Sequence, residues 1–418
     1  MPGEWRSATV EELQRDGILR VEDGNHGEYR PRKDEFVSSG VAFIRAADMD
    51  GGTVLFGSAA KINENARRRI TKGIGKPGDV LLSHKGTVGK LALVPDDAPP
   101  FVCSPQTTFW RTLDTKILDR KYLYAFLRSA GFTNQLVARA GETDMAPYVS
   151  LTSQRGFSVT LPPFHDQLAI AHILGTLDDK VELNRQRNQT LEAMARALFQ
   201  DWFVDFGPVR AKMEGREPYL PADLWQLFPD YLNGVGKPDG WEKKRVSDFL
   251  TLAYGKSLPA GKRNHGTIPV YGSGGVTGFH DEALITGPAV IVGRKGTVGS
   301  LYWEDRPCFP IDTVFYVQPE APVSFCFYLL KSLPLRDMNT DAAVPGLNRE
   351  NVYRLEVAHP PAELISAFAR AAARFRERIA AISRENETLV DLRDALLPKL
   401  ISGEVRVPDI ERYEKLAS

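Results

Sequence analysis

The sequence of 418 residues predicts an α+β protein: two mixed α/β domains in a pseudo-two-fold arrangement, separated by an antiparallel coiled coil of two long helices. A chain of this length suits two or three domains better than a single core. Its second half also repeats its first, because Ser83–Leu91 (SHKGTVGKL) returns as Gly293–Leu301 (GRKGTVGSL). A proline pair opens a long helical pattern at Pro162–Pro163, and a second pair does so at Pro360–Pro361. Two copies of a module followed by a helix indicate an internal two-fold axis.

Each module reads as mixed α+β. The apolar segments Asp79–Leu82 and Ala289–Val292 are predicted to be short buried strands. The Lys-Gly-Thr-Val-Gly that follows each of them is predicted to be a turn, because glycine adopts positive φ without steric cost. A second strand is expected to begin at Val88 in the first copy and at Val298 in the second. The spacing between matched landmarks differs in the two copies, so one scaffold carries loops of different length. Two related modules that recognise different things would have this property.

The helical patterns after the two proline pairs follow a sustained seven-residue repeat, which predicts one narrow apolar seam on each helix and a left-handed coiled coil. The seam positions are Leu174, Leu177, Val181, Asn188, Leu191 and Leu198 on the first helix, and Phe375, Ile379, Asn386, Leu389 and Leu396 on the second. Asn188 and Asn386 occupy matched positions, where a buried polar residue penalises slipped registers. Arg393 departs from the pattern, and Leu392 beside it could make the contact instead. The alternative is two independent amphipathic helices, each packed only on its own module.

These patterns divide the chain into six segments. They are a first recognition domain at 1–163, a first spacer helix at 164–206, a linker at 207–239, a second recognition domain at 240–361, a second spacer helix at 362–403, and a tail at 404–418.

The composition limits the classes of protein that need to be considered. No apolar run approaches the roughly 20 residues that span a bilayer, so no membrane association is expected. Cys103, Cys308 and Cys326 are widely spaced, which predicts reduced packed thiols, no metal site and a cytoplasmic setting. The net charge is zero, but this does not exclude nucleic acid as a partner, because local basic clusters set the contact field.

Signatures of catalysis are weak. Gly255-Lys256-Ser257 resembles the end of a phosphate-binding loop, but Leu250 stands where that loop requires glycine. Leu161-Pro162-Pro163-Phe164 resembles the Asp/Asn-Pro-Pro-aromatic clamp of amino-group DNA methyltransferases, but it lacks the polar first residue. We therefore predict no catalytic residues and no cofactor in this chain.

Basic residues gather where loops can reach a nucleic acid. Lysine and arginine would neutralise phosphates, while Arg, Asn and His on loops can read base edges. The predicted DNA-binding residues are Arg67, Arg69, Lys72, His84, Lys85 and Thr87 in the first module, and Lys256, Lys262, Arg263, Asn264, Arg294, Lys295 and Thr297 in the second. The alternatives are solvated surface for the charge runs and a purely structural hairpin turn for the two Lys-Gly-Thr sequences.

The order and duplication of these features resemble the specificity subunit of a type I restriction-modification system. The resemblance rests on the Lys-Gly-Thr-Val-Gly turns at Lys85 and Lys295, the double-proline helix starts and the matched helices. Asp201–Lys212 and Leu220–Asp223 are also similar to the family's first conserved region and its exit.

The resemblance implies two target-recognition domains, each reading one half of a bipartite, asymmetric double-stranded DNA site. It also implies that the helices set the spacer and dock two methyltransferase subunits, which bring S-adenosylmethionine and flip the target adenine. Restriction subunits with ATP and Mg would join the same assembly, and this chain would be non-catalytic. Two rival interpretations are a protein-interaction adaptor with two binding modules, and a fused DNA methyltransferase or nuclease whose motifs have diverged.

Overall fold

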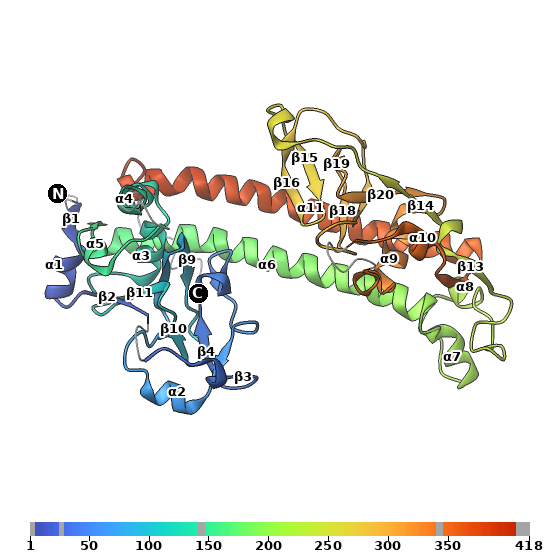
Figure 1. The fold of residues 1–418 in the computed structure, drawn as a ribbon, viewed down its shortest axis with the longest axis horizontal. Coiled ribbons are helices and arrows are strands. Elements are labelled where there is room, and N and C mark those ends of the chain that lie inside the picture. Colours follow the sequence, from blue (N-terminus) through green and yellow to red (C-terminus); the bar gives the residue numbers. More distant parts are fainter. Residues whose placement is uncertain (1–4, 25–28, 141–146, 340–345, 407–418) are drawn as a thin grey trace. The chain divides into compact units, whose positions relative to one another are not determined.

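The computed structural model describes residues 5–24, 29–140, 147–339 and 346–406, and the chain divides into two compact units (Figure 1). Unit 1 comprises residues 1–182 and 387–418, and unit 2 comprises residues 183–386. Each unit combines one α/β module with segments of both long helices, α6 (Phe164–Phe203) and α11 (Ala362–Ser402). The observed architecture therefore has the predicted α+β class.

The described residues of unit 1 form two four-stranded sheets and two pairs of strands, β1-β12 and β5-β6. The first sheet is antiparallel, with the order β2-β11-β8-β9, and the second has the order β10-β4-β7-β3. The strands are β1 (Arg6–Thr9), β2 (Leu19–Asp23), β3 (Phe36–Val37), β4 (Val41–Ile44), β5 (Met49–Asp50), β6 (Thr53–Val54), β7 (Lys61–Ile62), β8 (Val80–Lys85), β9 (Thr87–Leu93), β10 (Phe101–Cys103), β11 (Thr107–Thr112) and β12 (Ser158–Leu161). The short helices are α1 (Val10–Arg15), α2 (Glu64–Arg69), α3 (Arg120–Leu127), α4 (Ala130–Ala140) and α5 (Leu151–Arg155).

The main core of unit 1 combines aliphatic side chains with a group of packed aromatic rings. Trp110 of β11 packs edge-on against Phe132 of α4, with 5.6 Å between ring centroids, and Phe132 meets Phe157 at 5.3 Å. The apolar run Val80–Leu82 is buried as predicted, because it lies in an inner strand of the first sheet. At the end of β8, this sheet carries the predicted Lys-Gly-Thr turn of unit 1.

Unit 2 repeats the first sheet of unit 1 in the order β14-β20-β17-β18, and adds a three-stranded sheet β16-β15-β19. Its strands are β13 (Glu242–Arg245), β14 (Leu250–Tyr254), β15 (Ile268–Gly272), β16 (Gly275–His280), β17 (Ala289–Gly293), β18 (Leu301–Glu304), β19 (Phe309–Pro310), β20 (Val314–Pro319) and β21 (Glu356–His359). The short helices are α7 (Gly207–Met213), α8 (Ala222–Trp225), α9 (Val323–Ser332) and α10 (Arg349–Tyr353). The repeated sheet confirms the internal duplication.

One predicted strand start in unit 2 is wrong. The second strand begins at Leu301 and not at Val298, whereas in unit 1 it begins at Thr87, next to the predicted Val88. In unit 2 the turn is wider, because a hydrogen bond from the Gly293 amide to the Ser300 carbonyl (2.8 Å) closes it. A Cβ on Gly299 would lie 2.5 Å from the backbone of Leu335, so the wider turn packs tightly against that segment.

The helices α6 and α11 pack against each other in antiparallel fashion. In unit 1, Leu174 of α6 shares a core cluster with Leu400 of α11. In unit 2, Phe199 near the end of α6 packs edge-on against Phe368 near the start of α11, with 5.3 Å between centroids. The start of one helix thus lies along the end of the other. The alternative of two independent helices is wrong.

The predicted seam residues differ in how deeply they are buried. Leu174 and Val181 are buried, and the remaining ones are half-buried. Arg393 is explained by its charge rather than by packing, because its guanidinium Nη1 lies 2.8 Å from Oδ1 of Asp178 in unit 1. Leu392 does not replace it, since its side chain is exposed.

The asparagines of the helix pair do not meet as the matched positions suggested. Asn386 accepts a hydrogen bond from Nδ2 of Asn184 (3.0 Å), and the Asn184 side chain is fully buried. Asn188, which is half-buried, instead donates to the hydroxyl of the exposed Ser383 at 3.1 Å. The antiparallel register therefore brings Asn386 opposite a residue one helical turn before Asn188.

Each unit also contains an acidic residue of α6 between two cations. Asp178 contacts Arg128, which follows α3, and Arg393 of α11. In unit 2, Glu192 contacts Lys331 of α9 and Arg376 of α11. Buried or half-buried ion pairs of this kind favour one arrangement, because removing a partner would leave a desolvated charge.

The helices can also be compared with membrane spans. Across the described ranges, none of them is both long enough and apolar enough to cross a bilayer.

We predict that replacing both Asn184 and Asn386 with leucine raises the free energy of unfolding by about 1–2 kcal/mol, because a buried polar contact gives way to apolar packing. Urea denaturation of the full chain measures this. As a control, Asn188→Leu should change the value less than the double variant does, because Asn188 is only half-buried and its partner Ser383 is exposed. A lower melting temperature for the double variant would contradict the assigned partners.

Candidate nucleic-acid interface

The Lys-Gly-Thr turn of unit 1 projects from the end of the first sheet. Gly86 has φ +77°, which lets β8 reverse directly into β9. Lys85 and Thr87 on either side of it are exposed. The Gly86 amide donates to the carbonyl of Pro147 (2.9 Å), so the turn is held by the segment that precedes α5.

His84 does not belong to this exposed surface, which corrects its assignment as a DNA-contacting residue. Its side chain is 0% exposed, and Nδ1 lies 2.9 Å from the carbonyl oxygen of Val149. Successive side chains of a strand point to opposite faces, so an inward His84 accompanies an outward Lys85. His84 instead positions the segment that supports the turn.

The corresponding turn of unit 2 has the same support and different side chains. Gly296 has φ +81°, and Lys295 and Thr297 are exposed. The Leu347 amide donates to the carbonyl of Arg294 (2.8 Å), as the Val149 amide donates to that of His84 (2.9 Å) in unit 1. Arg294 is half-buried, and its guanidinium lies 5.0 Å from the ring centroid of Tyr254.

The supporting segments are a part of the repeat that the sequence analysis missed. In each unit the segment leads into a short, N-capped helix. The Ser150 side chain accepts a hydrogen bond from the Ser153 amide at the start of α5, and the Asn348 side chain accepts one from the Glu350 amide at the start of α10. The signal was present, because Pro147-Tyr148-Val149-Ser150 has the same spacing to its proline-paired helix as Pro345-Gly346-Leu347-Asn348.

The basic cluster of α2 is only partly available to a ligand. Arg69 donates to both carboxylate oxygens of Glu35, at 2.7 and 2.6 Å. The hydrogen bonds from Arg69 lower the pKa of the Glu35 carboxyl to about 2. Arg67 is half-buried and Lys72 is exposed. Arg69 therefore serves the fold of the module, and Lys72 is the more accessible cation.

The loop between β14 and β15 is also held by residues predicted to bind DNA. Arg263 donates from Nη1 to the carbonyl of Thr277 (2.7 Å), and Asn264 donates from Nδ2 to Asp281 (3.1 Å). Lys256 and Lys262 are exposed on the same loop. The loop thus uses two polar side chains for its shape and offers two lysines to solvent.

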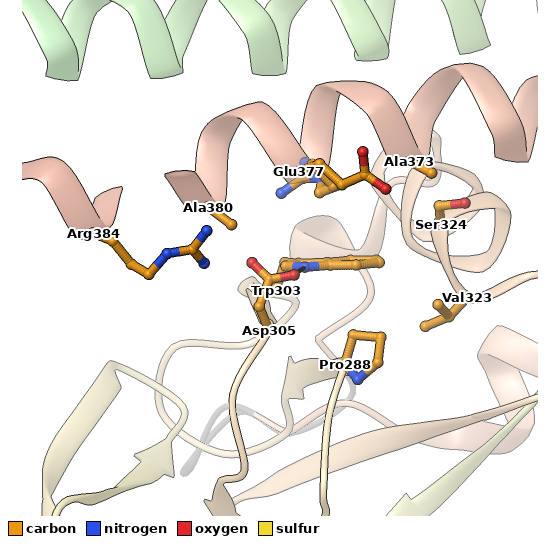
Figure 2. A pocket seen from close by; sticks show the side chains of 10 residues that line it. Pro288, Trp303, Asp305, Val323, Ser324, Ala373, Glu377, Ala380 and Arg384 are labelled. Atoms are coloured by element: carbon orange, nitrogen blue, oxygen red, sulfur yellow. Dashed lines mark hydrogen bonds between the residues drawn. The ribbon is translucent and has the colours of Figure 1, made fainter. Parts of the chain in front are cut away.

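A pocket of about 400 Å³ lies between the module of unit 2 and α11 (Figure 2). Trp303 lies at its centre, with Glu377 of α11 on one side and Pro288 and Val323 on the other, and Arg376 of α11 also lines it. The guanidinium of Arg376 lies 5.0 Å from the Trp303 ring, and its Nη2 donates to the Tyr328 hydroxyl (2.6 Å). Burial lowers the pKa of Arg376 to about 10. We interpret this pocket as a junction between module and helix.

The cysteines and the acidic and histidine side chains bear on nucleophile and metal chemistry. The three cysteine thiols are buried, and desolvation raises the pKa of each, to about 12 for Cys308 and Cys326. A protonated thiol is a poor nucleophile. No group of three or more His, Cys, Asp or Glu side chains suited to a metal ion occurs within residues 5–24, 29–140, 147–339 and 346–406.

Comparisons with known proteins point in one direction. The chain matches the family model of the type I restriction modification DNA specificity domain at residues 13–193 and 238–367. It is 26% identical to the type I restriction enzyme HindI specificity subunit of Haemophilus influenzae, over 87% of this chain and 94% of that protein. It is 22% identical to the MjaIX specificity subunit of Methanocaldococcus jannaschii, over 84% of this chain and 82% of that protein.

The fold is also similar to that of a solved protein. The crystal structure of a type I restriction-modification system S subunit from M. genitalium aligns with 97% of both chains, with a TM-score of 0.52 and 17% sequence identity. This likeness shows a shared fold.

We predict that His84→Ala lowers the free energy of unfolding by about 2 kcal/mol, because it removes a buried ring and its hydrogen bond to the Val149 carbonyl. Lys85→Ala, at the adjacent exposed position, is the matched control and should change stability by less than about 0.5 kcal/mol. Chemical denaturation of the full chain compares the two. Equal effects would contradict the structural role assigned to His84.

Proposed function

Since this chain belongs to the type I restriction modification DNA specificity family, we propose that its two modules read the two halves of a bipartite, asymmetric double-stranded DNA site. The chain is a non-catalytic specificity subunit with two target-recognition domains, and it assembles into a restriction-modification complex. We further propose separate roles for the two recognition domains and for the two long helices.

The proposal rests on the Lys-Gly-Thr turn, which occurs in both units with different neighbouring side chains. Both Lys-Gly-Thr turns leave the same kind of antiparallel sheet, and both are supported by the segment before a short N-capped helix. In unit 1 the residue before the exposed lysine is a buried histidine, and in unit 2 it is a half-buried arginine. A common framework with unlike side chains suits two different half-sites.

The residues proposed to contact DNA are the predicted basic or polar residues that are not buried and are not engaged in the loop and helix contacts described above. Lysine and arginine at these positions would neutralise phosphates and release counterions, so binding would weaken as the salt concentration rises. They are Arg67, Lys72, Lys85 and Thr87 in unit 1, and Lys256, Lys262, Arg294, Lys295 and Thr297 in unit 2.

The paired helices are proposed to set the spacer and to dock two methyltransferase subunits. Those partners would bring S-adenosylmethionine, and restriction subunits that join the complex would use ATP and Mg. The described part of this chain shows no metal cluster, and its buried cysteines have raised pKa values. Residues 1–163 and 240–361 are proposed as the exchangeable recognition segments, with 164–206 and 362–403 as the spacer helices.

We predict that replacing residues 1–163 with the matching module of a relative changes one half of the methylated DNA site and leaves the other half unchanged. The reason is that unit 2, including its turn and its loops, keeps its sequence. Sequencing methylated adenines in cells that express the chain with its methyltransferase partner measures both halves at once.

The reciprocal exchange of residues 240–361 is the control, and it should change the other half only. A change in both halves after either exchange would contradict independent reading. A complex that methylates no defined site, and shows no salt-dependent affinity for DNA, would favour the protein-interaction adaptor instead.

A further inference from the structure

Two arginines of unit 2 converge on one exposed tyrosine. The ring of Tyr254, at the end of β14, has 50% of its surface exposed. The guanidinium carbon of Arg294 lies 5.0 Å from its centroid, and that of Arg349 also lies 5.0 Å from it. The two positive groups are therefore within about 10 Å of each other, where they repel.

The fold fixes this cluster from three elements that are distant in sequence. Tyr254 pairs with Phe315 in the register of β14 and β20, and their rings are 5.0 Å apart. Arg294 directly follows β17, and its guanidinium also lies 5.8 Å from the Phe315 ring. Arg349 is the first residue of α10, the helix capped by Asn348. Stacking on aromatic faces holds both guanidinium groups in place before any ligand arrives.

Among the residues that the structure describes, the contacts of these two guanidinium groups give the cluster little charge compensation. Arg294 donates from Nη1 to a backbone carbonyl, that of Asp312 (3.2 Å). Arg349 lies 3.5 Å from the carboxylate of the adjacent Glu350, and both side chains of this pair are substantially exposed. Contacts of that kind are weakly stabilising in water. An anion within hydrogen-bond distance of both guanidinium groups would offset their mutual repulsion.

We propose that Arg294 and Arg349, aligned on Tyr254, form a clamp for a phosphate of the DNA backbone. The clamp rests on the proposed DNA-binding function and adds the ligand group that these residues take. A phosphodiester carries the negative charge that two converging guanidinium groups favour, whereas a base edge carries none. Two exposed lysines add positive charge near the clamp. They are Lys256, two residues after the end of β14, and Lys295, in the turn.

Unit 1 has a different arrangement of cation and tyrosine at its turn. Its turn lysine, Lys85, has Nζ 5.6 Å from the ring centroid of Tyr148, which comes from the supporting segment. That arrangement offers a single point charge and no planar fork. The paired-arginine clamp is therefore a property of the second recognition domain, and the two domains would hold the backbone by different means.

The test measures DNA affinity of the full chain, assembled with its methyltransferase partner, over a series of KCl concentrations. Two fragments are used: one that carries the methylated site and one of unrelated sequence. For Arg294→Gln with Arg349→Gln we expect at least about a tenfold weaker affinity for both fragments. The slope of log affinity against log salt should fall by about 2, since two phosphate-neutralising charges are lost.

Two further variants separate a clamp from general charge and from base reading. Arg216→Gln with Arg306→Gln removes the same charge from arginines of unit 2 that lie beside Glu214 and Glu304, and it should leave the slope unchanged. Arg294→Lys with Arg349→Lys keeps both charges and should retain most of the slope and the same methylated sequence.

Three outcomes would overturn the clamp. One is an unchanged slope in the glutamine variant, and another is an equal fall in the control. The third is a loss confined to the methylated site together with a relaxed sequence preference, which would mean that the arginines read a base. Absence of salt-dependent DNA binding in the unaltered complex would overturn the proposed function itself, and the clamp with it.

Discussion

Each of the two cores is completed by a helix from the opposite half of the chain. In unit 1, Leu397, Leu400 and Ile401 of α11 belong to the same cluster as Ile170 and Leu174 of α6. In unit 2, Phe199, Trp202 and Phe203 of α6 join the cluster that contains Phe368 of α11. The antiparallel pairing of α6 and α11 is therefore part of the interior of both units. The placement of both Lys-Gly-Thr turns depends on it, because the sheets that carry them pack on these interiors.

The charged contacts make α6 and α11 specific partners for each other. Asp178 and Arg376 occupy matched positions of the repeat and have opposite charge. Each satisfies its charge across the helix pair, Asp178 with Arg393 and Arg376 with Glu192. A pair made from two identical helices would lose these complementary contacts. The repeat thus keeps its apolar seam while it assigns different partners to its polar positions.

The features with a regular period could be predicted from the sequence, and the features that depend on side-chain direction could not. Both long helices, the duplicated sheet and the Lys-Gly-Thr turns follow from heptads, apolar runs and glycines. The orientation of His84 depends on where β8 begins, which the sequence does not state. The partner of Asn386 depends on a shift of one turn between the helices. Seven-residue periodicity locates the seam of a helix without defining which residues face each other across it.

In the candidate interface, too, repeated motifs could be predicted from the sequence, and contacts between distant residues could not. Exposed lysines in the turns were identified because their motif is duplicated. Arg349 and Tyr254 were missed, because they become neighbours of Arg294 only when β14, β17 and α10 are assembled. Arg69 and Arg263 read as ligand-binding cations in the sequence, but they are engaged by Glu35 and by the Thr277 carbonyl. A charge run shows where cations are concentrated, and tertiary contacts decide which of them remain accessible.

The way in which α11 completes unit 1 has a consequence for biosynthesis. Ile170 and Leu174 are covered by residues near 400, which a ribosome adds more than two hundred residues after it has added Leu174. Until then the first recognition domain would emerge with an apolar strip open to water, and such strips attract other chains and chaperones. Synthesis that stops within the second module would leave this strip uncovered. Completion of this core therefore waits for α11, and a chain that stops before α11 would keep the apolar strip in contact with water.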